Sequence, residues 1–168
     1  ALDRLDLDQI YYWRIDEVNE AHADSPWKGS VWSFTSEPVA ETVASGLITA
    51  TASSVDSIDI EADDASNGAG LAGDGLHDIF RATMWLSAAD DPEPWIRFDL
   101  DRIYKLHEMR VWNYNSDIEG LAGQGIKEAK IDYLDAAGNW LELYAATTLN
   151  QAPGKSGYAA NTVVPLDG

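Results

Sequence analysis

Carboxylates make up most of the side chains in this sequence that could do chemistry. Five of them lie between residues 56 and 64, but their spacing matches neither an EF-hand loop nor another metal-binding motif. The three histidines, His22, His77 and His107, are too dispersed to share a metal ion, and there is no cysteine. No nucleophile motif and no recognisable acid–base pair is present. We therefore expect a protein that is not an enzyme.

The overall composition narrows the class of partner. The chain has 168 residues, of which 45% are hydrophobic and 24% charged, so it can form one domain, or one domain and part of another. Eleven Lys and Arg against 29 Asp and Glu give a net charge of −18. Such a surface repels phosphate backbones and anionic lipid, which makes nucleic acid and anionic membranes poor candidates.

The first 36 residues contain two strand patterns separated by a loop. Along residues 10–16, Tyr11, Trp13 and Ile15 fall on one face, which is the period of a half-buried strand. A second strand pattern covers residues 30–35, after a segment with proline and glycine. We predict that the two strands pair as an antiparallel hairpin.

This hairpin resembles the last two strands of a fibronectin type III-like domain. The resemblance is carried by YYWRIDEVN, by GSVWSFTS and by Leu5, which stands six residues before Tyr11. It implies that Tyr11 is the corner tyrosine of such a domain. Residues 1–36 are accordingly predicted to be its C-terminal hairpin, and residues 37–46 a linker.

After the linker, short strand patterns alternate with polar, glycine-rich turns. Strands are expected at 47–53, 95–101, 106–114, 126–134, 140–145 and 161–166, and helical turns near 62–67 and 118–121. This pattern favours an all-β fold, an antiparallel β-sandwich or jelly roll. Within 95–101 we expect Ile96, Phe98 and Leu100 to point inward, and Arg97 and Asp99 outward.

Residues 47–168 resemble a discoidin-like domain, the coagulation-factor type C fold shared with many bacterial carbohydrate-binding modules. The matching segments are ITATASS (48–54), ASNGAGL (65–71), ATMWLS (82–87), PWIRFDL (94–100), RVWNYN (110–115), GIK (125–127), IDY (131–133) and AGNW (137–140). The family's sandwich ends with two further strands after the region that matches residues 158–168, where this sequence stops. We therefore expect a discoidin-like jelly roll that is truncated at its C-terminal end.

The resemblance also implies a structural calcium ion near the Asn67-Gly68 turn. Asn67 stands where the family usually has aspartate, and Thr83 matches the threonine just before the family's tryptophan. Backbone carbonyls around Asp64 and Ala69 would complete this part of the site, and calcium prefers such oxygen ligands. A plain glycine turn is the alternative interpretation of the same residues.

In the family, ligands bind at three loops at one end of the sandwich, which correspond here to residues 55–59, 88–93 and 113–123. The ligand-binding residues predicted there are Asp56, Ile58, Asp90, Asp91, Asn113, Tyr114 and Asn115, to which the inserted loop adds His77. Carboxylates and amides suit sugar hydroxyls, and an aromatic ring suits the C–H face of a sugar. Asp and Asn are also common in turns, so each could serve a turn instead.

Together these features predict a non-catalytic, extracellular module that binds a glycan or polysaccharide within a larger secreted protein. The domain combination resembles secreted multidomain proteins of planctomycete-type bacteria, whose parent chain could be a glycoside hydrolase or a sulfatase. A protein-adhesion or structural spacer module of a cell-surface protein is the alternative left open. Five tryptophans, Trp13, Trp32, Trp85, Trp95 and Trp140, are expected to lie in the core or at its edge.

Overall fold

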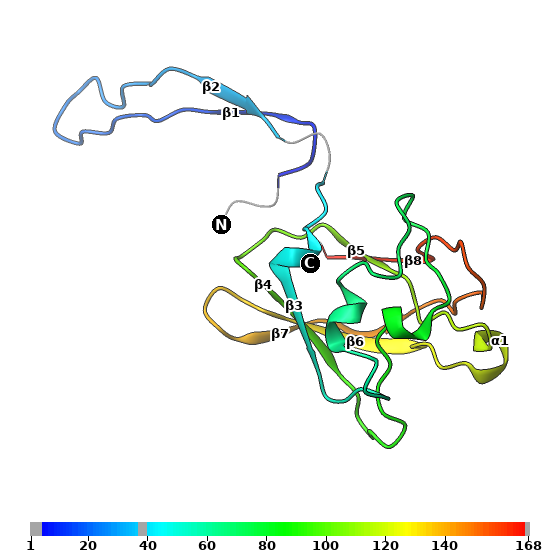
Figure 1. Ribbon diagram of the computed structural model, residues 1–168. Coiled ribbons are helices and arrows are strands. Elements are labelled where there is room, and N and C mark those ends of the chain that lie inside the picture. The colour runs from blue at the N-terminus through cyan, green and yellow to red at the C-terminus, as the bar shows by residue number, and fades with distance from the viewer. Residues whose placement is uncertain (1–4, 37–39, 167–168) are drawn as a thin grey trace. The chain divides into compact units, whose positions relative to one another are not determined.

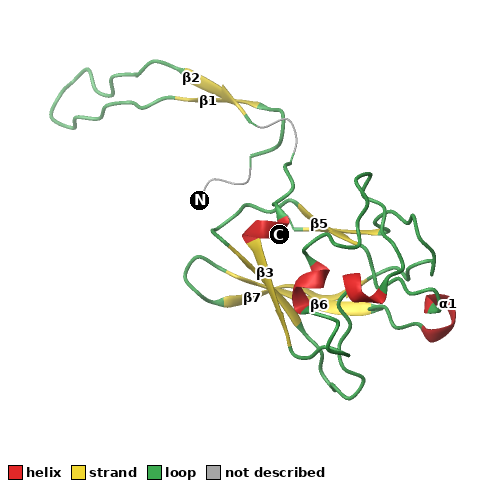
Figure 2. Cartoon of the chain, in the orientation of Figure 1, coloured by secondary structure: helices red, strands yellow, loops and turns green. Residues whose placement is uncertain are grey.

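The chain divides into two compact units, Ala1–Thr42 and Val43–Gly168 (Figure 1). The computed structural model describes residues 5–36 and 40–166, so part of the expected linker, residues 37–39, lies outside the described residues. Strands, short helical turns and long loops make up the described chain (Figure 2). None of the helices in these ranges is long and apolar enough to cross a membrane.

The first unit is built around an antiparallel hairpin of β1 (Ile10–Trp13) and β2 (Trp32–Thr35). Tyr11 lies opposite Phe34 and Trp13 opposite Trp32, and the ring centroids are 5.7 and 5.9 Å apart. These stacked cross-strand pairs hold the two strands in register. The predicted pairing is confirmed, although Ile15 lies beyond the end of β1.

Beyond the strands, the connecting segment stays paired through a second ladder contact. Glu17 and Trp27 exchange two backbone hydrogen bonds of 2.9 Å, and the Asp16 carboxylate accepts the Gly29 N–H. A Cβ at Gly29 would collide with the Ile15 carbonyl oxygen, so only glycine allows the two backbones to approach this closely. The loop is thus a continuation of the hairpin.

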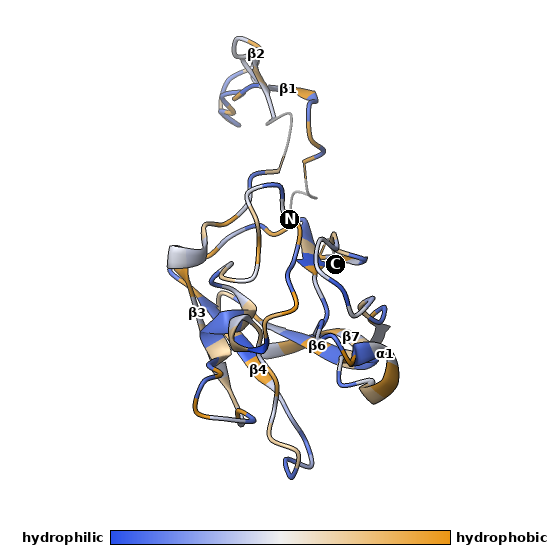
Figure 3. Ribbon diagram, turned by 45° about the vertical axis from the view of Figure 1, so that its right-hand side comes forward, coloured by the Kyte–Doolittle hydropathy of each residue, from blue (hydrophilic) through white to orange (hydrophobic). Residues whose placement is uncertain are grey.

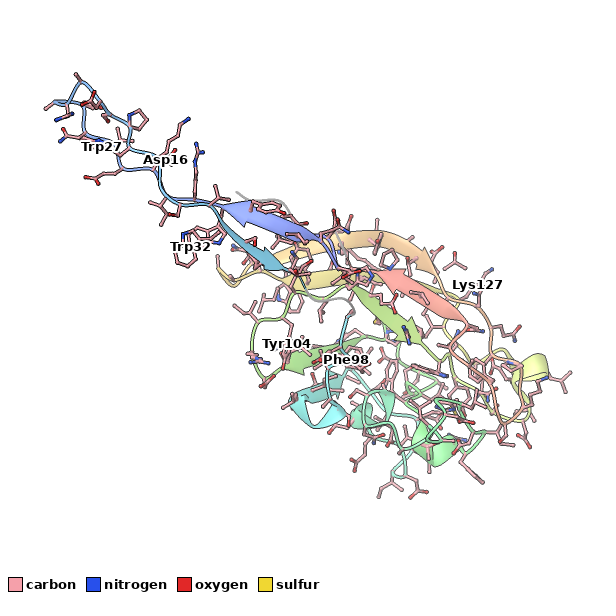
Figure 4. All side chains as sticks on the ribbon, turned by 90° about the horizontal axis from the view of Figure 1, so that it is seen from above. Asp16, Trp27, Trp32, Phe98, Tyr104 and Lys127 are labelled. Atoms are coloured by element: carbon pink, nitrogen blue, oxygen red, sulfur yellow. The ribbon has the colours of Figure 1, made fainter. Side chains whose placement is uncertain are left out.

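The expected burial is wrong for four of the five tryptophans. Trp13, Trp32, Trp95 and Trp140 are 47%, 61%, 52% and 57% exposed, and Figure 4 shows Trp32 projecting away from the hairpin ribbon. A two-stranded sheet has no second layer to cover its rings, and Trp140 begins a strand instead of lying within it. Trp85 is half-buried and its indole N–H donates to the Ser54 carbonyl.

The second unit contains three antiparallel strand pairs. They are β3 (Ile48–Ala52) with β4 (Ile96–Leu100), β5 (Glu108–Val111) with β8 (Thr162–Pro165), and β6 (Glu128–Leu134) with β7 (Trp140–Thr148). The helical turns are η1 (Ser45–Leu47), η2 (Ala62–Ala65), η3 (Arg81–Thr83) and α1 (Glu119–Ala122). The six predicted strands and both predicted helical turns are confirmed, and the fold is the expected antiparallel β-sandwich.

Side chains alternate along the β3–β4 pair as its sequence indicates, except at Phe98 and Asp99. Along β3, Ala50 is buried between exposed Thr49 and Thr51, and Figure 3 shows hydrophobic and hydrophilic residues alternating here. On β4 the inward prediction is wrong for Phe98, which is 41% exposed. Asp99 is half-buried, because Arg97 on the same face donates a 2.9 Å hydrogen bond to its carboxylate.

An acidic side chain accepts a backbone hydrogen bond at the edge of β3 that does not pair with β4. The Ser53 N–H donates to the Trp95 carbonyl, and the Asp101 N–H donates to the Leu47 carbonyl. The backbone N–H and C=O groups of the odd-numbered residues of β3 therefore point toward β4. The Ala50 N–H therefore points to the opposite edge, where the Asp63 carboxylate accepts it at 2.7 Å. Asp63 lies in η2, so this bond also fixes the helical turn against the strand.

Most of the best-buried residues of the second unit belong to loops. The buried apolar residues are Ala50, Ile60, Met84, Tyr114, Leu149, Ala152, Tyr158 and Val164, and only Ala50 and Val164 lie in strands. The core therefore extends from the sheets into the loop end of the unit. Loops packed in this way are held more rigidly than solvated loops, which suits a binding site.

Replacing Asp63 by alanine should destabilise the second unit, because the Ala50 N–H would lose its acceptor at a buried position. We expect the free energy of unfolding to fall by about 1–3 kcal/mol. Asp63→Asn keeps a side-chain carbonyl and should restore most of the loss. Denaturant unfolding of both variants measures this, and equal losses in the two would contradict the role of the edge bond.

Candidate functional site

A fully buried amide joins three loops of the second unit. Asn115 is 0% exposed, and its side-chain NH2 donates to the Asp78 carbonyl at 2.8 Å and to the Lys155 carbonyl at 2.9 Å. Its side-chain oxygen accepts the Gly154 N–H at 2.9 Å. Asn115 was predicted to bind a ligand, but its side-chain hydrogen-bonding groups bind the backbone of other loops instead.

Asn113 does the same for a second set of loops. It is 3% exposed, and its amide donates to the carbonyls of Ile126 and Asn150 and accepts the N–H groups of Tyr114 and Ile126. Four bonds use the full capacity of one side-chain amide. In this structure Asn113 thus offers no free group to a sugar.

The loop that follows is closed by a buried carboxylate. Glu119 is 0% exposed and accepts the N–H groups of Gln124 at 3.1 Å and Gly125 at 3.0 Å. A Cβ at Gly125 would lie within 3.1 Å of both Glu119 and Asn113, so glycine is required where the loop returns. These bonds hold residues 113–125 as one compact loop that contains α1. In Figure 1, α1 and η3 lie at the same end of the second unit.

Tyr114 and Ser116 bring polar groups to this end. Burial raises the pKa of the Tyr114 phenol, an effect opposed by nearby Arg81 and reinforced by Glu119. The Ser116 hydroxyl lies beside that phenol, is buried, and has no hydrogen-bond partner of regular geometry among the described residues. An unpaired buried hydroxyl is uncommon and leaves one group available for a ligand or water.

An ion pair between the 55–59 loop and η3 lies at this end of the second unit. Arg81, at the start of η3, forms an ion pair with the carboxylate of Asp56. A hollow of about 280 Å³ adjoins the pair, lined by Ser57, Asp59, Ile60, Arg81 and Ala82. Ile60 is 2% exposed, whereas neighbouring Ile58 is 95% exposed. Of the predicted ligand residues, Asp56, Ile58 and Tyr114 therefore lie at or near the hollow.

Asp91 has a structural position between two loops. Its carboxylate accepts the hydroxyls of Ser53 and Ser54, each at 2.6 Å, and these bonds lower the pKa of the carboxyl. The Ser54 hydroxyl in turn accepts the Ala88 N–H. Asp91 thus ties the end of β3 to the 88–93 loop, while its neighbour Asp90 is exposed.

His77 anchors the inserted loop. It is 7% exposed, its backbone pairs with Tyr158, and its ring Nδ1 donates a 2.9 Å hydrogen bond to the Asp78 carbonyl. The ring packs so closely on Gly70 that a Cβ there would lie 2.7 Å away. His77 borders a second hollow, of about 410 Å³, formed by residues 69–78 with Ser156 and Gly157.

The four predicted calcium ligands are found in two local hydrogen-bonded turns. The Asp64 carboxylate accepts from Asn67 and from the Glu61 N–H, and the Asn67 side-chain oxygen accepts the Ala69 N–H. The Thr83 hydroxyl bonds to the Asp78 carboxylate and the Phe80 carbonyl. Within the described ranges no three His, Asp or Glu side chains gather as metal ligands. The side-chain oxygens of Asn67 and Thr83 thus already make hydrogen bonds, whereas the prediction at Asp64 and Ala69 concerns their backbone carbonyls.

Three groups near the hollow were not among the predicted ligand residues. Arg81 pairs with Asp56, Ser116 carries the unpaired hydroxyl, and Phe80, next to Arg81, is 68% exposed. Only the succession of an aromatic and a basic residue, Phe80-Arg81, was visible as a signal in the sequence. The role of Arg81 depends on Asp56, which lies in a loop more than twenty residues away in the sequence.

Asn115→Ala should destabilise the second unit strongly. It would leave the Gly154 N–H and the Lys155 carbonyl without this partner and would remove one of the two bonds to the Asp78 carbonyl, and we expect a loss of about 3 kcal/mol in unfolding free energy. Asn139→Ala is the matched control, because its amide makes only long contacts with Asp135 in an exposed turn. Its effect should stay within about 0.5 kcal/mol. Similar melting temperatures for the two variants would refute the bridging role of Asn115.

Most of the second unit matches a known protein family. Residues 71–163, more than half of the chain, match the family described as NedA-like, galactose-binding domain, of the F5/F8 type C group. No match was found among curated proteins or among solved structures. The match covers Arg81, Tyr114 and Ser116 and the strands β4 to β7. The chain therefore belongs to the NedA-like, galactose-binding domain family, and its second unit is a discoidin-like module of the kind that binds carbohydrate.

Proposed function

We propose that the second unit binds a sugar residue of a glycan in the hollow beside Arg81, without catalysing a reaction. The observation that carries this proposal is the Asp56–Arg81 pair at the edge of a 280 Å³ hollow in a galactose-binding-like domain. A hollow of this size suits a single sugar ring better than a long chain.

The chemistry around the hollow fits sugar hydroxyls. The Arg81 guanidinium donates and the Asp56 carboxylate accepts, so the pair can engage two neighbouring hydroxyls of one ring. Exposed Ile58 and Phe80 provide apolar surface for the C–H groups of the ring.

The wider role is proposed from the resemblance and from the first unit. The Tyr11 hydroxyl accepts the Asp6 N–H at 2.7 Å, a bond to upstream backbone that supports a fibronectin type III-like corner tyrosine. We propose an extracellular module that holds a larger secreted protein, such as a glycoside hydrolase or sulfatase, near its glycan. The net charge of −18 supports partners other than nucleic acid or anionic membranes.

One observation favours the alternative, protein adhesion. The stacked rings of Trp13 and Trp32 are 47% and 61% exposed, and exposed apolar surface of this kind marks contact sites. A glycan array separates the two functions. Binding of defined sugars supports the glycan module, and a blank array with retained binding to a cell-surface protein would support adhesion.

Arg81→Ala should weaken glycan binding by about tenfold or more, because a hydrogen bond from a charged group to the sugar is lost. Arg97→Ala is the matched control, since Arg97 is also an exposed arginine paired with an aspartate, Asp99, outside the hollow. Isothermal titration with galactose measures both, alongside thermal unfolding. If both variants bind as tightly as the wild type, the hollow is not the site.

Calcium remains a prediction from the family resemblance, with Asp64, Asn67, Ala69 and Thr83 as the residues that would hold it. A calcium ion bound only to the folded state would raise the melting temperature as its concentration rises. Thr83→Val, which removes one oxygen ligand, should reduce that rise. Thermal unfolding in millimolar calcium and in chelator measures it, and identical melting curves for the wild type would remove calcium from the proposal.

A further inference from the structure

The Arg81 guanidinium at the hollow is paired with a carboxylate of the same chain. Asp56 and Arg81 form an ion pair in which the Asp56 side chain is 25% exposed and the Arg81 side chain 50% exposed. The Asp56 backbone is itself held, since its N–H donates to the Leu86 carbonyl at 2.8 Å. The carboxylate is thus kept beside the guanidinium, and the positive charge of Arg81 is compensated before a ligand arrives.

Further negative charges lie at this end of the second unit. Asp59 lines the hollow, and Asp117 and Glu119 are close enough to Tyr114 to influence its phenol. At an exposed or partly exposed site such charges act through water and are individually weak, but here they share one sign. An anionic sugar would therefore meet repulsion, and would have to compete with Asp56 for Arg81.

Displacing Asp56 from Arg81 is unfavourable for a carboxylated sugar. The new ion pair would only replace the existing one, and it would leave Asp56 unpaired next to a second negative charge. A neutral sugar requires no such exchange, because its hydroxyls can bind the guanidinium and the carboxylate together.

We propose that Asp56 is a specificity-determining residue that makes this site select neutral sugars and exclude carboxylated or sulfated ones. This inference rests on the proposed function, since it concerns the ligand class of the same hollow. Asp56 acts in two ways: it accepts a hydroxyl of a neutral sugar, and it neutralises the Arg81 guanidinium to which an acidic sugar would otherwise bind.

The test compares galactose with galacturonic acid, which has the same ring but a carboxylate in place of the exocyclic CH2OH group. Wild-type protein should bind galacturonate at least about tenfold more weakly than galactose. Asp56→Asn should bind galactose more weakly and galacturonate more tightly, so that the preference shrinks or inverts. Glu93→Gln removes the same charge from an exposed position on a neighbouring loop and should keep the wild-type preference.

The outcomes separate the two proposals. Wild-type protein that binds neither sugar, nor any glycan on an array, would overturn the proposed function. Wild-type protein that binds both sugars equally would leave glycan binding in place and overturn the role of Asp56. An unchanged preference in Asp56→Asn, or an equal shift in Glu93→Gln, would also overturn it.

Folding is checked in the same experiment. Thermal unfolding of Asp56→Asn shows whether the variant is native, and Asp56→Ser provides a second replacement that removes the charge. The wild-type preference between the two sugars needs no variant, so it decides the exclusion of acidic sugars even if both replacements unfold.

Discussion

The side-chain amide of Asn115 is the interaction on which the loop end of this domain depends. It bonds to backbone groups of Asp78, Gly154 and Lys155, three positions that are remote from it in sequence. Buried backbone groups are costly without partners, and loops lack the regular ladders that satisfy them in sheets. One fully buried amide solves this for three loops at once.

Two other buried polar side chains bind loop backbone groups in the same way as Asn115. Asn113 bridges two further loops with four bonds, and the buried carboxylate of Glu119 closes the turn at residues 119–125. Because these polar groups are used internally, the groups left at the surface are few and well positioned. They include the Asp56–Arg81 pair. A rigid polar scaffold that presents a small number of well-positioned polar groups is the arrangement that reduces the entropy cost of binding a sugar.

Charge shapes what this arrangement can bind. A chain with a net charge of −18 places a single arginine at the hollow and pairs it with a carboxylate. The family assignment indicates carbohydrate, and the local charges decide between neutral and acidic members of that class. The first unit contributes differently, through stacked and exposed aromatic rings on a hairpin.

The sequence by itself determined the strands, the hairpin and the family. Alternating side chains between glycine-rich turns mark strands because their period of two is local, so each of the six strands of the second unit was predictable. Tertiary structure alone decided which polar residues bind and which hold the fold. Asn113, Asn115, Asp91 and His77 look like ligand groups in a loop sequence, yet each is engaged by backbone or side chains from other segments. The pairing of Arg81 with Asp56 was not visible until the fold brought the two residues together. A side chain's free hydrogen-bonding capacity is what remains after its neighbours in space are satisfied, and those neighbours are set by the fold and not by adjacency in the chain.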